Sequence, residues 1–167
     1  NLITQALLTL IPEKVTPIFI CIGSDLVLGD SLGPLCGTLL KERGIATYVY
    51  GTLSFPVTAK EIKDAKTYLK ELHPDTITVA IDAAIGSPDD VGLIRVIKGG
   101  LKPGLCVDKE LGQIGDISMV GVVAGKSVQN YNLFNLTRLN LVYKMAENIV
   151  EGIMGFSKAR KIVDNIT

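Results

Sequence analysis

Pro17-Ile-Phe-Ile-Cys-Ile-Gly23 is a continuous apolar run, rich in β-branched residues and closed by a glycine. A run of this kind is typical of a strand that is covered on both faces. Thr76-Ile-Thr-Val-Ala-Ile-Asp-Ala83 is a second run of the same type. Strands that are buried on both faces need helices above and below the sheet, so the two runs predict an α/β fold.

The rest of the chain alternates between helical and strand patterns. Apolar residues at helical spacing predict helices over residues 1–11, Ser31–Arg43, Thr58–Leu72 and Tyr131–Phe156, and strand patterns cover Ala46–Tyr50, Gly92–Ile97 and Ile117–Val123. Strand-helix-strand units close with the right hand and place their helices on the faces of the sheet. We therefore expect a three-layer α/β/α sandwich with a mostly parallel, mixed central sheet.

Length and composition favour one domain over residues 1–167, because domains average about 150 residues. Hydrophobic residues make up 47% of the chain and the mean hydropathy is +0.37, which suits a buried sheet. The 17 basic and 17 acidic residues balance, so no net field attracts nucleic acid or an anionic membrane. Tryptophan is absent and aromatic residues are 5%, which argues against a single-strand nucleic-acid binder.

The three cysteines predict a reducing, cytoplasmic compartment. Cys21, Cys36 and Cys106 are odd in number, far apart and set in apolar stretches, so they suggest neither a disulfide framework nor a Cys-x-x-Cys metal site. Residues 1–11 are apolar but have no basic leader and are too few to cross a bilayer. We expect them to form an amphipathic helix and the protein to have no membrane partner.

Two aspartates are the candidate catalytic residues. Ligands of open α/β sheets gather at the carboxyl ends of the parallel strands. Asp30 lies in the glycine-punctuated loop between Gly23 and Pro34, and Asp82 is expected to end its strand. Two carboxylates in one crevice cannot both ionise easily, so one holds a proton while the other acts as base, an arrangement that activates water for amide hydrolysis.

Each aspartate also has a structural interpretation. Asp30 precedes a helix and could be its N-cap, although Ser31 could cap instead and leave Asp30 for other work. For Asp82 the structural interpretation is weaker, because a carboxylate beside Ile81 and Ala83 is costly to bury. The neighbouring Asp25 could assist or could be a plain turn residue.

Substrate-binding candidates come from the same loop and from a longer one. They are Ser24, Asp25, Gly29 and Ser31, together with Lys109 of the glycine-rich stretch Gly99–Asp116. Long irregular loops in compact domains are often functional, so we expect this stretch to fold over the crevice.

Other sites are not supported by the sequence. The stretch Gly121-Val-Val-Ala-Gly-Lys-Ser127 has three residues between its glycines, where a Walker A loop needs four, and no Gly-x-Gly-x-x-Gly follows a strand. His73, the single histidine, precedes the strand of Asp82 by enough residues to lie roughly 20 Å away, too far to share a metal or build a nucleophilic triad. We expect no metal and no cofactor.

Several motifs resemble a known family. They are Cys21-Ile-Gly-Ser-Asp25, Gly29-Asp-Ser-Leu-Gly-Pro34, Gly51-Thr-Leu53, Ile81-Asp-Ala83, Lys102-Pro-Gly104 and Leu136-Thr-Arg-Leu139. Together they resemble the YyaC family of sporulation proteins of spore-forming Firmicutes, over about residues 18–149. That family looks related to the spore germination protease and more remotely to the hydrogenase maturation proteases. The resemblance implies a germination-protease-like α/β/α domain of the phosphorylase/hydrolase-like type.

The resemblance also implies a site. In the germination protease, aspartates in a Pro-Asp-Ala-Leu-Gly-Pro and an Ile-Asp-Ala stretch form the proposed catalytic pair, and by motif they match Asp30 and Asp82. The hydrogenase maturation enzymes add a histidine to two carboxylates to hold a metal, and this chain has no histidine at the corresponding loop.

The function that follows is a sporulation-associated peptidase, which hydrolyses peptide bonds of a protein substrate with an aspartate pair. Its expected location is the cytoplasm of the sporulating cell or forespore, with a spore protein as a candidate partner. A catalytically silent relative that serves as a binding or regulatory module is the alternative. Whether the chain forms a homo-oligomer stays open.

Overall fold

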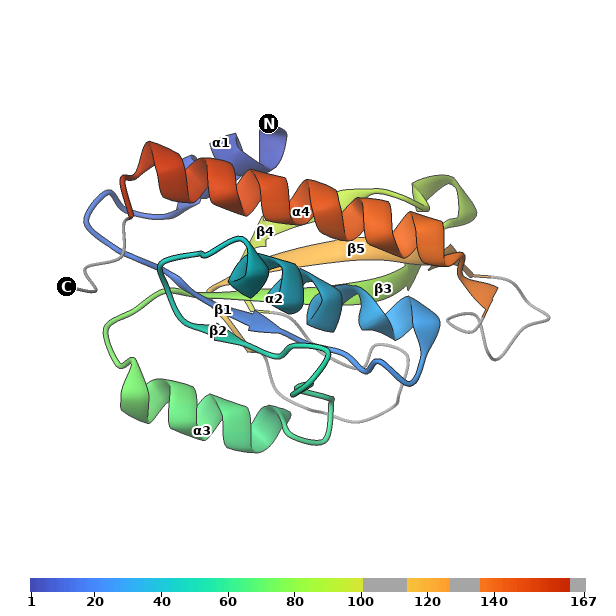
Figure 1. The fold of residues 1–167 in the computed structure, drawn as a ribbon, viewed down its shortest axis with the longest axis horizontal. Coiled ribbons are helices and arrows are strands. Elements are labelled where there is room, and N and C mark those ends of the chain that lie inside the picture. The colour runs from blue at the N-terminus through green and yellow to red at the C-terminus, as the bar shows by residue number, and fades with distance from the viewer. Residues whose placement is uncertain (101–113, 127–135, 163–167) are drawn as a thin grey trace.

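A computed structural model describes residues 1–100, 114–126 and 136–162 of the chain (Figure 1). The α-helices are α1 (Leu2–Leu10), α2 (Leu32–Glu42), α3 (Ile62–Leu72) and α4 (Leu139–Ala159). The strands are β1 (Ile18–Cys21), β2 (Val49–Tyr50), β3 (Thr78–Gly86), β4 (Ile94–Lys98) and β5 (Ile117–Gly125). Two short 3₁₀ turns, η1 (Leu28–Ser31) and η2 (Pro88–Asp90), follow β1 and β3.

The five strands form one mixed sheet in the order β2-β1-β3-β5-β4. The strands β2, β1, β3 and β5 run parallel, and β4 lies antiparallel to β5 at one edge. β1 and β3 pair directly, with Ile18 opposite Thr78 and Cys21 opposite Ile81. The expected parallel pairing of these two strands is therefore confirmed, as is the mostly parallel α/β sheet.

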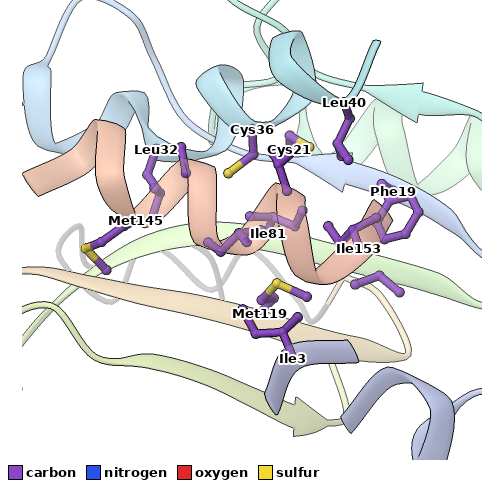
Figure 2. Close-up of a cluster of buried hydrophobic side chains, with 14 of the residues drawn as sticks. Ile3, Phe19, Cys21, Leu32, Cys36, Leu40, Ile81, Met119, Met145 and Ile153 are labelled. Carbon is purple, nitrogen blue, oxygen red and sulfur yellow. The ribbon is translucent and has the colours of Figure 1, made fainter. Parts of the chain in front are cut away.

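Helices cover both faces of the sheet (Figure 1). Phe19 and Cys21 of β1 point into a core shared with α1, α2 and α4, whereas Ile18 and Ile20 point into a second core with α3. This alternation follows from the period of two in a strand. Figure 2 shows the first core, where Cys21 and Cys36 lie among large apolar side chains such as Ile81. The two cores explain why the strands are apolar on both faces.

Glycines let α2 pack directly on the carboxyl end of β1. A Cβ added at Gly33 would lie 2.0 Å from the carbonyl oxygen of Ile22, and one at Gly37 would lie 1.9 Å from the carbonyl oxygen of Gly51. No side chain fits in those spaces. The start of α2 and the turn before it are therefore held against the strand ends at close range.

Several boundaries differ from those expected. β2 is limited to Val49–Tyr50 instead of starting at Ala46, and α3 starts at Ile62 instead of Thr58. The backbone N–H of Thr58 donates to the Glu61 carboxylate at 2.9 Å, so the chain makes a local turn there before the helix begins.

The last helix also starts later than the apolar pattern indicated. The expected start at Tyr131 falls outside the described residues, but Arg138 has an extended backbone and α4 begins only at Leu139. Leu136 and Leu139 are mostly exposed, whereas Val142, Met145, Ile149 and Ile153 of the same apolar stripe are buried. No helix in the described part of the chain has the length and apolar character that a membrane crossing requires.

Candidate active site

The loop after β1 returns to the strand end and brings Asp30 there. Gly23 has a φ of +143°, and a Cβ on it would lie 2.0 Å from the carbonyl oxygen of Asp30. The next amide, that of Ser24, donates to the same carbonyl oxygen at 3.1 Å. A glycine is needed at position 23 because only it tolerates both the positive φ and the close approach. Asp30 is thus held beside the end of β1.

Neither Asp30 nor Ser31 is a capping residue. Asp30 lies inside η1, which runs straight into α2, and the residue at the N-cap position of α2, Ser31, makes no capping hydrogen bond. The Ser31 hydroxyl donates instead to the carbonyl oxygen of Leu28 at 2.6 Å. The interpretation of Asp30 as an N-cap is therefore wrong, because Asp30 already lies inside the helical turn, with Val27 at the N-cap position of η1 and Ser31 at that of α2.

Asp82 lies in the middle of β3, not at its end as expected. β3 continues to Gly86 because its later residues stay paired with β5, where Asp82 itself is opposite Val120. The neighbour β1 has ended by this point, since its last pair joins Cys21 to Ile81. Asp82 therefore lies where one side of its strand has lost its partner, which leaves room for the turn η1 to pack against β3.

The two carboxyl groups interact electrostatically. Burial raises the pKa of Asp82 well above its usual value, and the charge of Asp30 raises it further. The backbone amide of Ala83 donates a hydrogen bond to the Asp82 carboxylate, which lowers the pKa in part. Burial raises the pKa of Asp30 from 3.8 to about 6, and a backbone hydrogen bond with Ser24 partly offsets this rise. Burial and the charge of Asp30 therefore favour the protonated form of Asp82, whereas Asp30, with a pKa of about 6, is mostly ionised near neutral pH.

The substrate-binding candidates of the loop lie around Asp30. The Ser24 hydroxyl accepts a hydrogen bond from the Leu26 amide at 3.2 Å, Asp25 is exposed and Gly29 is buried within η1. Ser31 is buried and uses its hydroxyl on the turn itself. Lys109 and most of the stretch from Gly99 to Asp116 lie outside the described residues, so the prediction for that stretch stays a prediction.

His73 is engaged elsewhere. Its Nε2 is 2.7 Å from the hydroxyl of Tyr50, and its ring lies 4.7 Å from that of Tyr48, next to the edge strand β2. In the described part of the chain no three side chains of His, Cys, Asp or Glu are grouped so as to hold a metal ion. The described residues around Asp30 and Asp82 do not fit a metal site made of two carboxylates and a histidine.

The two described cysteines are unreactive by position. Cys21 and Cys36 are free and fully buried. Burial raises the pKa of Cys21 to about 12 and that of Cys36 well above its usual value, so neither is a nucleophile at neutral pH. Cys106 lies outside the described residues.

One segment beside the site begins in the motif Gly51-Thr-Leu53, to which the sequence assigned no role at the site. The turn from Thr52 to Phe55 follows β2, and after it the carbonyl of Val57 accepts the Gly23 amide at 3.0 Å. Beyond that motif, the signal in the sequence is weak: apolar residues, Leu53 and Phe55, stand inside a turn where polar residues are usual.

Sequence comparison with known proteins gives a family match and a relative. The family model described as "Protein of unknown function (DUF1256)" matches residues 1–152. The uncharacterized protein YyaC of Bacillus subtilis (strain 168) is 41% identical over 137 residues, which cover 81% of this chain and 67% of that protein.

Solved structures of proteases share the architecture. The NiFe hydrogenase maturation protease HycI of Thermococcus kodakarensis KOD1 superposes with a TM-score of 0.58 at 18% identity, over 95% of this chain and 99% of its own. The hydrogenase 3 maturation protease gives a TM-score of 0.55 at 15% identity, over 93% of this chain and 100% of its own. The superpositions show a common fold, and identities this low show the fold alone.

Proposed function

The chain belongs to the DUF1256 family, and from this premise we propose that it is a peptidase in which Asp30 and Asp82 activate water to hydrolyse a peptide bond. The observation that carries the proposal is the pair itself. Two partly buried carboxyl groups interact at the end of β1, and burial favours a shared proton between them. The protease-type fold supports the same class of reaction.

The two aspartates have different roles in this mechanism. Asp30, with a pKa of about 6, is ionised at neutral pH and takes a proton from a water molecule. The resulting hydroxide adds to the peptide carbonyl carbon while Asp82, whose pKa is raised well above its usual value, donates its proton to the carbonyl oxygen. In the second step Asp30 passes its proton to the leaving nitrogen, the C–N bond breaks, and Asp82 recovers its proton from the diol hydroxyl.

The substrate in this proposal is a protein of the sporulating cell, and the site of action is the cytoplasm of that cell or of the forespore. The resemblance of the motifs Gly29–Pro34 and Ile81–Ala83 to those of sporulation proteins supports this context. The hydrogenase maturation proteases, by their names, act on proteins, which supports a protein substrate as a class.

Peptide hydrolysis by single-residue variants tests the proposal. An equimolar library of random decapeptides is incubated with the protein and the fragments are identified by mass spectrometry. Asp30→Asn and Asp82→Asn should each reduce the cleavage rate by at least about 10²-fold, because an amide keeps the shape but cannot exchange the proton. The double variant should be no slower than either single variant, since the pair acts as a unit.

Asp75→Asn is the matched control, because Asp75 is exposed in the turn before β3, away from the pair. It should keep wild-type activity, and a chelator should leave the wild-type rate unchanged. Full activity of either aspartate variant would contradict the mechanism. Absence of cleavage by the wild type would favour the alternative, a binding or regulatory module without catalysis.

A further inference from the structure

Exposed apolar side chains follow the strand ends at the edge of the sheet that carries the candidate pair. Of the large apolar residues that are exposed in the described part, a group follows the carboxyl ends of the parallel strands β1, β2 and β3: Leu26, Leu53, Phe55, Val91 and Leu93. Leu26 is 88% exposed and Phe55 is 82% exposed. Clustered exposed apolar side chains mark binding surfaces in soluble proteins, whereas single ones are ordinary.

Three hydrogen bonds hold the turn that carries Phe55. The backbone amide of Thr52 donates to the Phe55 carbonyl at 3.0 Å, and the Phe55 amide donates to the Thr52 hydroxyl at 3.1 Å. The amide of Leu53 donates to the hydroxyl of Thr38 in α2 at 2.9 Å, which ties the turn to a helix of the core. An apolar side chain on a fixed backbone binds with little loss of conformational entropy. The turn therefore exposes the Phe55 side chain on a backbone that hydrogen bonds hold in place.

Leu26 lies on the adjacent loop, where a hydrogen bond also holds its backbone. The backbone amide of Leu26 donates to the Ser24 hydroxyl at 3.2 Å. Ser24 follows Gly23, whose backbone amide donates to the carbonyl oxygen of Val57. The loops that carry Leu26 and Phe55 are thus joined by a backbone hydrogen bond at the end of β1.

The spacing between this surface and Asp82 follows from the sheet. Ile22 forms a parallel bridge with Val57 on one side, and its amide donates to the carbonyl of Ile81 on the other at 2.8 Å. Val57 and Asp82 are therefore separated by two strand spacings, about 10 Å. An extended peptide advances about 3.3 Å per residue. Phe55 is two residues from Val57, so its backbone lies within a few residues of extended peptide from Asp82.

We propose that Phe55 and Leu26 are specificity-determining residues, which bind an apolar side chain of the peptide substrate a few residues from the scissile bond. This inference rests on the proposed function and narrows it to substrates with an apolar residue at that distance. The occupant is an extended segment of the protein substrate. Its backbone lies across the end of β1 while its scissile bond lies at Asp30 and Asp82.

Capture and cleavage of the same random decapeptide library test this assignment. Peptides bound by the Asp82→Asn variant are sequenced, with and without Phe55→Ser or Leu26→Ser added. Captured peptides should be enriched in Phe, Leu, Ile or Met, and each serine substitution should lower their capture by about tenfold. Leu72→Ser, which changes an exposed leucine at the far end of α3, should leave capture unchanged. In the wild type, cleavage should fall within a few residues of the apolar side chain.

The outcomes separate the two proposals. Apolar enrichment that depends on Phe55, with no cleavage by the wild type, would overturn the peptidase and support the binding surface. Cleavage without apolar preference, or with a preference that survives Phe55→Ser, would overturn the specificity assignment alone. A dimer that Phe55→Ser dissociates without any change in peptide capture would assign the surface to a second copy and would likewise overturn it.

Discussion

Replacing Asp30 by asparagine should make the protein more stable near neutral pH while it removes activity. Burial raises the pKa of the Asp30 carboxyl from 3.8 to about 6, a rise of roughly two units. At about 1.4 kcal/mol per unit, ionising this group in the folded state costs about 3 kcal/mol more than in the unfolded chain. Solvent around the exposed part of the side chain reduces this cost to about 1–2 kcal/mol. The asparagine amide carries no charge and avoids the cost.

The gain in stability should depend on pH in a defined direction. Between pH 3.8 and about 6 the folded state binds more protons at Asp30 than the unfolded state does, so the free energy of unfolding falls as pH rises through this interval. The Asp30→Asn variant lacks this contribution. The two proteins should therefore have nearly equal stability below about pH 3.8, and the variant should lead by the full amount near pH 7.

Urea unfolding and thermal melting at several pH values measure this difference. For a chain of 167 residues, the expected gain corresponds to a rise in Tm of about 4 °C near pH 7. Asp75→Asn, at an exposed position, should change Tm very little at any of these pH values. A variant no more stable than the wild type near pH 7, or one equally stabilised at low pH, would refute the claim that a buried ionised carboxylate strains this site.

Two further predictions concern the packing around the site. Gly33→Ala should destabilise the protein by about 3 kcal/mol in urea unfolding, because the added Cβ would lie 2.0 Å from the backbone carbonyl oxygen of Ile22. An unchanged unfolding midpoint would show that α2 is not held this closely against the strand end. In a Cys106→Ser background, Cys21 and Cys36 should react with a thiol reagent only after unfolding, because burial raises the pKa of both thiols; rapid labelling of the native protein would contradict their buried positions.

The stability prediction and the proposed activity have the same physical origin. Shielding a carboxyl group from water raises its pKa, and the same shielding costs stability when the group ionises. Pairs of this kind occur where a fold tolerates the cost for chemistry. The opposite effects expected for Asp30→Asn on Tm and on cleavage therefore test one cause by two independent measurements.

Much of the fold was predictable because it depends on local patterns. The apolar runs ending at Gly23 and Ala83 predicted strands covered on both faces, and the structure has them as the adjacent parallel strands β1 and β3. The periodic stripe from Val142 to Ile153 predicted a helix with a buried face, which is α4. Errors occurred at the ends of elements. There, hydrogen bonds such as that between Thr58 and Glu61 decide where a helix begins, and periodicity carries little information.

The sequence by itself determined which residues could do chemistry here. They are two aspartates, Asp30 in a loop that follows an apolar strand and Asp82 near the end of another, and the apolar pattern places both at one edge of the sheet. Only the tertiary structure decided how they behave. It put Asp82 in mid-strand where β1 has ended, and it placed Asp30 close enough for its charge to raise the pKa of Asp82. It also joined the loop of the Phe55 turn to Gly23 by a hydrogen bond. The reason is that strand pairing, burial and electrostatic coupling depend on residues far apart in the chain, whereas the periodicity of a segment depends only on its neighbours.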